Sequence, residues 1–206
     1  MREQHYTLPQ AKVRGVFCLE TDWTDITRAP TVEPLLDLLS RSPIRIPYIH
    51  RNVVTRDALL HYLDKWTQRK HDDFPILYVG FHGIEGEVQF GDLRKRSSHM
   101  SIEEFEKHLA GRCGGRVIHF SSCRTLFLHH KRIQRFLSAT GAVAVSGYGR
   151  DIDWIRSAVL DMALLAAMQQ NAFTASGLRA VRDRMMRRYG PELKALKFRM
   201  VVREGR

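Results

Sequence analysis

Short apolar runs rich in β-branched and aromatic residues alternate with segments of helical periodicity, and this alternation constrains the fold more than any other feature. The third run, residues 75–81, is continuously apolar, as expected for a central parallel strand buried on both faces. The apolar runs cover residues 13–19, 44–53, 75–81, 116–120 and 142–146. The helical patterns cover residues 31–40, 55–66, 101–109, 130–138 and 154–170. The sequence therefore predicts an α/β chain with a three-layer α/β/α fold and a mostly parallel central sheet.

Local signals refine this prediction. Pro47, inside the second run, predicts an edge strand or an imperfectly paired one, because proline lacks the N–H that a central strand needs. Thr31 is predicted to cap the first helix, and Ser101 with Glu104 forms the pattern of a capping box. Alternation in "EGEVQFGDL", residues 85–93, predicts a hairpin at the end of the sheet.

The length of 206 residues fits a single core. We expect residues 1–172 to form the α/β domain and residues 173–206 to add a basic helix and a strand packed on the same domain. Residues 1–15 are too polar for a secretory signal, and the longest apolar run, residues 158–168, is too short to span a bilayer. A soluble, cytoplasmic protein is predicted.

Cysteine usage favours reduced thiols. Cys18, Cys113 and Cys123 are odd in number and lack CxxC spacing, which argues against a disulfide framework or a structural zinc site. No histidine and cysteine spacing fits a metal site, so we expect no metal and no cofactor. A free thiol can act as a nucleophile.

The net charge of +11 is concentrated towards the C-terminus. Residues 173–206 hold ten Lys or Arg residues against three acidic residues. Such a segment is either a solvated helix face with a tail or a surface for nucleic acid or an acidic protein. The second hypothesis predicts salt-dependent binding that charge reversal at Arg184, Arg187 and Arg188 removes.

Two reactive residues follow two of the predicted strands. His82 comes directly after the third run and Cys123 comes after the fourth. Because the carboxyl ends of parallel strands meet at one edge of a sheet, we expect the two side chains to converge there. A thiol and an imidazole make a nucleophile and its general base, and the backbone N–H groups of Gly83 and Cys123 could stabilise an oxyanion.

Four stretches resemble the caspase-like cysteine peptidases, the clan of caspases, metacaspases and CHAT-type proteases. The similar stretches are "FHGIEGEVQFGD" (81–92), "MSIEEFEKHL" (100–109), "VIHFSSCRT" (117–125) and "AVAVSGYGRDIDWIRSA" (142–158). The His-before-Cys order, with about 40 residues between the two, agrees with the caspase layout. The resemblance covers most of residues 13–170 and implies a small, bacterial-type cysteine endopeptidase with His82 and Cys123 as its catalytic dyad.

The resemblance also implies how a polypeptide substrate binds. An extended peptide would lie beside residues 146–154 and contact a set of residues in that segment. This set is Ser146, Gly147, Tyr148 and Trp154. Trp154 is either a wall of the cleft or a core anchor, whereas Tyr148, between two glycines, is predicted to contact ligand.

Two departures from caspases bear on specificity. Residues 121–125 are Ser-Ser-Cys-Arg-Thr instead of Gln-Ala-Cys-Arg-Gly. The first strand ends in an acidic segment, with Glu20, Asp22 and Asp25, where caspases that cleave after Asp carry a basic residue. This segment is either an ordinary polar loop or a pocket that favours cleavage after a basic residue.

Two alternatives to an ungated protease remain. The chain could be a catalytically silent caspase-like interaction module, or its basic C-terminal part could carry the function. A stand-alone cytosolic protease is hazardous, so gating by an activating protein partner is expected. Cys18 and Cys113 are predicted to be structural.

Overall fold

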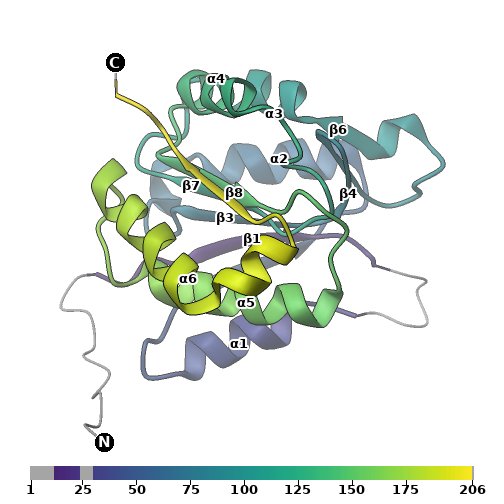
Figure 1. Cartoon of the computed structure of the whole chain (residues 1–206). Coiled ribbons are helices and arrows are strands. Elements are labelled where there is room, and N and C mark those ends of the chain that lie inside the picture. The colour runs from purple at the N-terminus through teal and green to yellow at the C-terminus, as the bar shows by residue number, and fades with distance from the viewer. Residues whose placement is uncertain (1–11, 24–29, 206) are drawn as a thin grey trace, which may run out of the picture.

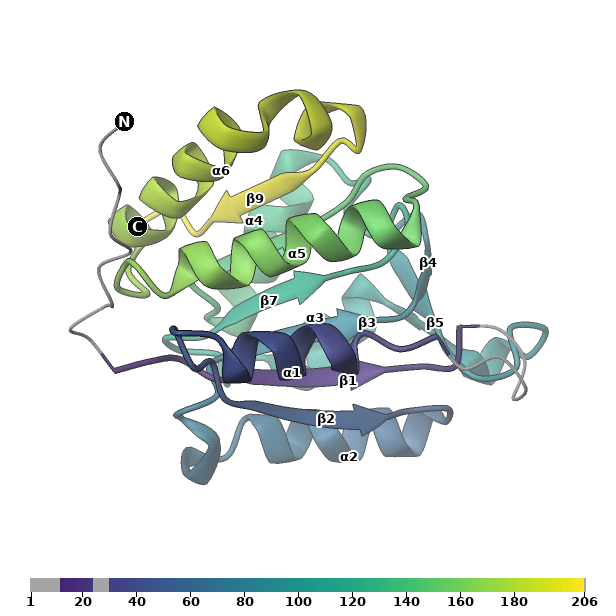
Figure 2. The same cartoon turned by 90° about the horizontal axis from the view of Figure 1, so that it is seen from below.

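The structure, a computed structural model, describes residues 12–23 and 30–205 and contains a six-stranded sheet between two layers of helices (Figure 1). The strands lie in the order β2-β1-β3-β7-β8-β9. Their bounds are β1 (Val16–Glu20), β2 (Tyr48–Asn52), β3 (Ile76–Gly80), β7 (Val117–Phe120), β8 (Ala144–Gly147) and β9 (Arg199–Val202). All neighbours pair in parallel except β9, which runs antiparallel to β8, as Figure 2 shows. The predicted three-layer fold with a mostly parallel sheet is confirmed, and β2 lies at the edge, as Pro47 predicted.

Three helices cover each face of the sheet (Figure 1). One layer contains α1 (Glu33–Arg41), α5 (Trp154–Met168) and α6 (Ala175–Ala195), and the other contains α2 (Arg56–Trp66), α3 (Ile102–Leu109) and α4 (His130–Thr140). Side chains alternate between the two cores: Ile76 and Tyr78 of β3 pack with the first layer, whereas Leu77 packs with the second. Burial of each aliphatic side chain stabilises the fold by roughly 1.5–3 kcal/mol, which explains why the run at residues 75–81 is continuously apolar.

A second, smaller sheet lies beyond the carboxyl end of β3. It consists of β4 (His82–Ile84), β5 (Glu87–Gln89) and β6 (His99–Ser101), all antiparallel, and it confirms the predicted hairpin. Gly86 forms the turn between β4 and β5 with a φ of 72°, a left-handed conformation that glycine adopts without strain. Two single 3₁₀ turns, Arg69–His71 and Arg96–Ser98, complete the regular structure of the described residues.

The predicted helix caps had different outcomes. Ser101 and Glu104 form the expected capping box at the start of α3. Thr31 was predicted to cap α1, but the residue at that position is Val32, which has no side-chain cap bond. The hydroxyl of Thr31 lies one residue earlier, where it accepts from the N–H of Glu33 and donates to the carboxylate of Glu20.

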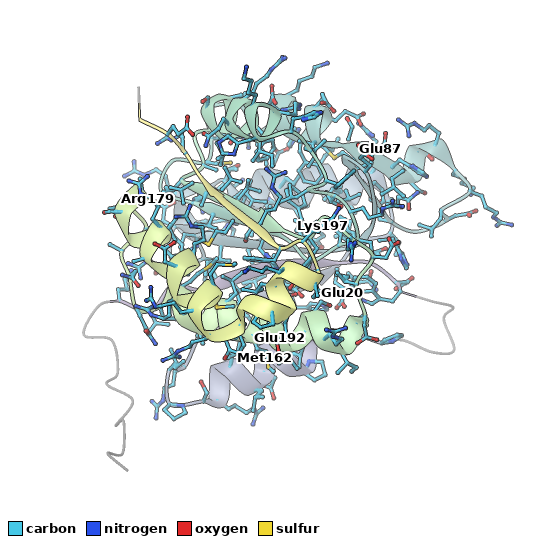
Figure 3. The ribbon with its side chains drawn as sticks, viewed as in Figure 1. Glu20, Glu87, Met162, Arg179, Glu192 and Lys197 are labelled. Carbon is cyan, nitrogen blue, oxygen red and sulfur yellow. The ribbon has the colours of Figure 1, made fainter. Side chains whose placement is uncertain are left out.

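The C-terminal segment joins the same sheet. Helix α6 packs against α5, and β9 then pairs with β8. Pro191 and the non-helical backbone of Tyr189 kink α6 near its end, because proline cannot donate the helical hydrogen bond. Figure 3 marks Arg179 near the start of α6 and Lys197 just after its end. Within residues 12–23 and 30–205, no helix has both the length and the apolar character to cross a membrane.

Candidate active site

His82 and Cys123 line one cavity at the carboxyl ends of the parallel strands. His82 opens β4, two residues after β3 ends, and Cys123 follows β7 by three residues. The cavity has a volume of about 200 Å³. Its other lining residues are Trp23, Val32, Tyr78, Ser121, Ser122, Ile152, Trp154, Ser157 and Ala158. Figure 2 shows why these segments meet: β4, β5 and the start of α5 all lie beyond the arrowheads of the parallel strands.

The two segments that carry His82 and Cys123 touch through their backbones. A Cβ atom on Gly83 would collide with the carbonyl oxygen of Cys123 and with the hydroxyl of Thr125. The same hydroxyl donates to the carbonyl of Glu87 in β5 at 3.1 Å, and it pairs with Ser122 Oγ at 2.8 Å. The absence of a side chain at residue 83 therefore allows the close approach that places the histidine and the cysteine on one cavity.

The imidazole of His82 is held by packing. Its ring stands edge-on to the indole of Trp23, with centroids 5.3 Å apart and an interplanar angle of 70°. The indole N–H of Trp23 in turn donates to Glu20 at 2.5 Å. Among the described residues, no group hydrogen-bonds to either ring nitrogen of His82 in this arrangement. Both nitrogens are therefore available to a thiol or a substrate.

Cys123 is half-buried, and its surroundings disfavour the thiolate. Burial raises the pKa of the Cys123 thiol, and the nearby Asp151 acts in the same direction. The N–H of Ile152 points at Sγ from 3.4 Å and opposes this rise without reversing it. Since the thiolate is the reactive form, a neighbouring base is needed to generate it.

The backbone turns sharply directly after the cysteine. Arg124 has a φ of 53°, in the left-handed region that non-glycine residues rarely adopt. Its N–H donates to the carbonyl of Arg150 at 3.2 Å, which joins the turn to the segment that covers the thiol. Among the described residues, no carbonyl accepts the N–H of Cys123 itself, which lies beside its own thiol and could turn to an oxyanion formed there.

A buried hydrogen-bond network lies beneath the cavity and was not predicted from the sequence. Its centre is Asp161 of α5, which is 2% exposed. Hydrogen bonds reach its carboxylate from Tyr78 (2.8 Å), His119 (2.8 Å), Ser121 (2.6 Å) and Tyr148 (2.6 Å). Burial alone would raise the pKa of Asp161, but the charge and hydrogen bond of His119, with the hydroxyl donors, hold it below its ordinary value.

The same network ties the strands to the segment that bears the nucleophile. Ser121 precedes Cys123 by two residues, and the second ring nitrogen of His119 lies 2.9 Å from Ser146 Oγ in β8. One sequence signal could have indicated it, because Asp161 is the single charged residue in the apolar stretch 158–168. A lone acid in such a stretch must be paired when buried.

Two of the three acidic residues expected at the specificity pocket, Glu20 and Asp22, are not among the lining residues of the cavity. Glu20 is 3% exposed, and Asp22 is exposed and accepts a hydrogen bond from Asn52. Asp25 lies outside the described residues. Burial alone would raise the pKa of Glu20, yet hydrogen bonds led by His50 hold it below its ordinary value. Glu20 is a structural acceptor near the cavity instead of an open carboxylate.

Three of the four residues expected to bind an extended substrate are buried. Ser146 and Tyr148 are fully buried, and Gly147 packs against the carbonyl of Phe120. None of these three is among the lining residues of the cavity, because β8 is an interior strand and the Tyr148 hydroxyl donates to Asp161. Trp154 does line the cavity, and its indole N–H is buried without a partner among the described residues.

Other candidates lie away from the cavity. Cys18 and Cys113 are fully buried, and burial raises the pKa of Cys113 to about 12, so neither is a competing nucleophile. On α6, Arg187 and Arg188 are exposed, whereas Arg184 donates to the carbonyl of Ala167 at the end of α5. The described part of the chain contains no cluster of three or more residues that could hold a metal ion.

The chain matches the model of a known protein family. The model of a family of unknown function (DUF6642) matches residues 14–202, which is nearly the whole of the described chain. No curated protein matches the sequence.

Proposed function

The chain belongs to the DUF6642 family, and we propose that it is a cysteine endopeptidase with Cys123 as the nucleophile and His82 as the general base. One observation carries the proposal: the thiol and an imidazole that has no hydrogen-bond partner among the described residues line the same cavity at the carboxyl ends of the sheet. Ligands of open α/β sheets bind at this edge.

The proposed reaction is acyl transfer to the thiol. His82 takes the proton from Cys123, and the sulfur attacks the carbonyl carbon of a peptide bond. His82 then gives that proton to the departing amine, and a water molecule hydrolyses the thioester. Burial raises the pKa of the resting thiol, which is why the proposed attack needs His82 as a base.

The oxyanion would be held by backbone donors. The N–H of Cys123 supplies one, and Gly83, whose Cα lies against the Cys123 carbonyl, is proposed to supply the other. Acyl-transfer sites commonly hold the oxyanion with two such donors.

We also propose that a protein partner gates the site in the cytoplasm. The segment from Arg150 to Ile152 covers the thiol, with the Ile152 N–H bonded to Sγ, so a shift of this segment would uncover the nucleophile. The alternative is a silent module in which this contact is permanent. The two differ in whether thiol reactivity depends on His82.

The decisive experiment is N-terminal profiling of a cell lysate incubated with the protein. Termini that appear with the native chain and not with Cys123→Ala are expected. Cys113→Ala is a matched control, because it removes a thiol that lies outside the cavity. Identical sets of termini from native protein and Cys123→Ala would contradict the proposal.

A further inference from the structure

We infer that the cavity beside Cys123 receives the substrate side chain that precedes the scissile bond, and that it selects an uncharged apolar side chain such as Leu or Met. The inference rests on the proposed function and differs from the basic preference that the acidic segment after the first strand predicted. It depends on the walls of the cavity and on the state of two carboxylates behind them.

The walls that a side chain would touch are mostly apolar. They come from the segments around β1 and from the start of α5. The apolar lining residues are Trp23, Val32, Ile152, Trp154 and Ala158. A volume of about 200 Å³ lies below the roughly 300 Å³ at which pockets begin to enclose a drug-sized ligand, so the space suits a single side chain.

The four hydroxyl groups of the lining residues are hydrogen-bonded within the fold. The hydroxyl of Ser121 donates to Asp161, that of Ser122 pairs with Thr125, and that of Ser157 donates to the carbonyl of Trp154. The hydroxyl of Tyr78 also donates to Asp161. These groups therefore offer little to a polar side chain that enters.

The first carboxylate near the cavity, Glu20, has no free acceptor position. Oε1 accepts from the indole of Trp23 at 2.5 Å and from the N–H of Val32 at 2.8 Å. Oε2 accepts from Thr31 at 2.6 Å and from His50 at 2.7 Å. A carboxylate has about four acceptor sites, so all the acceptor sites of Glu20 are occupied by donors of the fold and none remains for a substrate.

The second carboxylate, Asp161, is saturated in the same way. Oδ1 accepts from His119 and Tyr148, and Oδ2 accepts from Tyr78 and Ser121. Two of its donors, Tyr78 and Ser121, line the cavity and stand between the carboxylate and the space. Neither of these two carboxylates therefore offers an acceptor for the charge of an Arg or Lys side chain.

An acidic side chain would meet no permanently charged partner among the described lining residues. None of these is Lys or Arg, and their one basic side chain is His82, which the proposed mechanism uses as a neutral base. The indole N–H of Trp154, which has no partner among the described residues, is neutral and can serve a peptide carbonyl without favouring either charge. Since a buried charge without a partner is strongly disfavoured, neutral side chains remain.

The test uses peptidyl acyloxymethyl ketones that differ only in the residue beside the reactive ketone: Leu, Met, Arg, Lys or Asp. Cys123 sulfur forms a bond to the methylene carbon, the carbon–oxygen bond to the acyloxy group breaks, and the carboxylate leaves. His82 takes the thiol proton. Adducts are counted by intact mass, and the Leu and Met probes are expected to react at least about tenfold faster than the other three.

A pair of variants tests the wall directly. Ala158→Asp places a carboxylate in the cavity and is expected to raise the rate with Arg relative to Leu at least about tenfold. Val159→Asp introduces the same charge at the next residue, which is half-exposed and outside the lining, and should leave the ratio unchanged. The thermal unfolding of both variants is measured to confirm that they fold.

The outcomes separate the two claims. A faster reaction with Arg or Asp than with Leu in the native protein overturns the inference and leaves the peptidase standing. If the native protein prefers the Leu probe and His82→Ala does not change the rate, the inferred selectivity of the cavity is supported and the proposed role of His82 as general base is contradicted. Absence of any adduct, in protein whose Cys123 still reacts with iodoacetamide, overturns both.

Discussion

The backbone of Gly83 lies against the carbonyl oxygen of Cys123, so close that a Cβ on Gly83 would collide with that oxygen. The segment of His82 and the segment of Cys123 therefore meet without a side chain of residue 83 between them. The contact joins the start of the small antiparallel sheet to the turn after β7. It is the closest structural link between the two proposed catalytic residues.

Gly83→Ala should therefore disable the site. The added Cβ would force the two segments apart, which we expect to lower the free energy of unfolding by about 1–3 kcal/mol. Displacement of the histidine by about 1 Å should lower peptidase activity about 100-fold. Gly114→Ala is the matched control, because a Cβ there meets nothing within 4 Å. Urea denaturation and a cleavage assay measure the two effects, and equal behaviour of the two variants would show that the contact is unimportant.

The reactivity of Cys123 should rise steeply with pH. Its pKa is raised above its ordinary value, so the thiolate fraction, and with it the rate of iodoacetamide alkylation, should grow about tenfold per pH unit from pH 7 to pH 9. Intact mass spectrometry follows the adduct, with Cys123→Ala reporting any reaction of the two buried thiols. A rate already constant below pH 8 would instead indicate a resting thiolate–imidazolium pair.

Asp161→Asn should destabilise the chain strongly. The amide oxygen cannot accept four hydrogen bonds, so buried donors lose their partner, at an expected cost of about 3 kcal/mol or more. Asp153→Asn, on the same helix, should change stability by less than about 0.5 kcal/mol, because it is exposed and asparagine caps a helix as well as aspartate does. Denaturant midpoints compare the two variants, and a similar small effect of both would show that the network is dispensable.

Stability should fall in acid because of two buried carboxylates. The pKa values of Glu20 and Asp161 are both lowered in the folded chain relative to ordinary values near 4. Their contribution is thus complete above about pH 5 and is lost as the pH falls below 4 and through the folded values. Urea midpoints from pH 7 to pH 3 measure this. Glu20→Gln should weaken the dependence of the urea midpoint on pH below pH 5. An unchanged pH dependence in that variant would show that other groups cause the loss of stability in acid.

Much of the α/β fold was predictable because it depends on the local pattern of apolar and polar residues. Continuous apolar runs predicted the five parallel strands, and a sheet of that kind brings strand ends together, which is why His82 and Cys123 share a cavity. For Trp154 the sequence left two alternatives, a wall of the cleft or a core anchor, and the structure places it in the cavity lining.

The polar residues around the site were not predictable in the same way. Tyr148 lies between two glycines, a context typical of an exposed loop, and only the packing of α5 against β8 shows that its hydroxyl is satisfied inside. Glu20 looked like an open acid because its donors, Thr31 and His50, come from segments distant in sequence. Saturation of a carboxylate is a tertiary property that no local pattern records.

Helix α5 contributes residues both to the cavity and to the buried network beneath it. Its first turns supply Trp154, Ser157 and Ala158 to the cavity, and the next turn supplies Asp161 to the network beneath. A substitution that tilts the helix to reshape the cavity must also move the carboxylate away from its donors. Evolution of a new substrate preference should therefore proceed through Trp23, Val32 and Ile152. These residues lie outside α5 and can change while Asp161 keeps its hydrogen bonds.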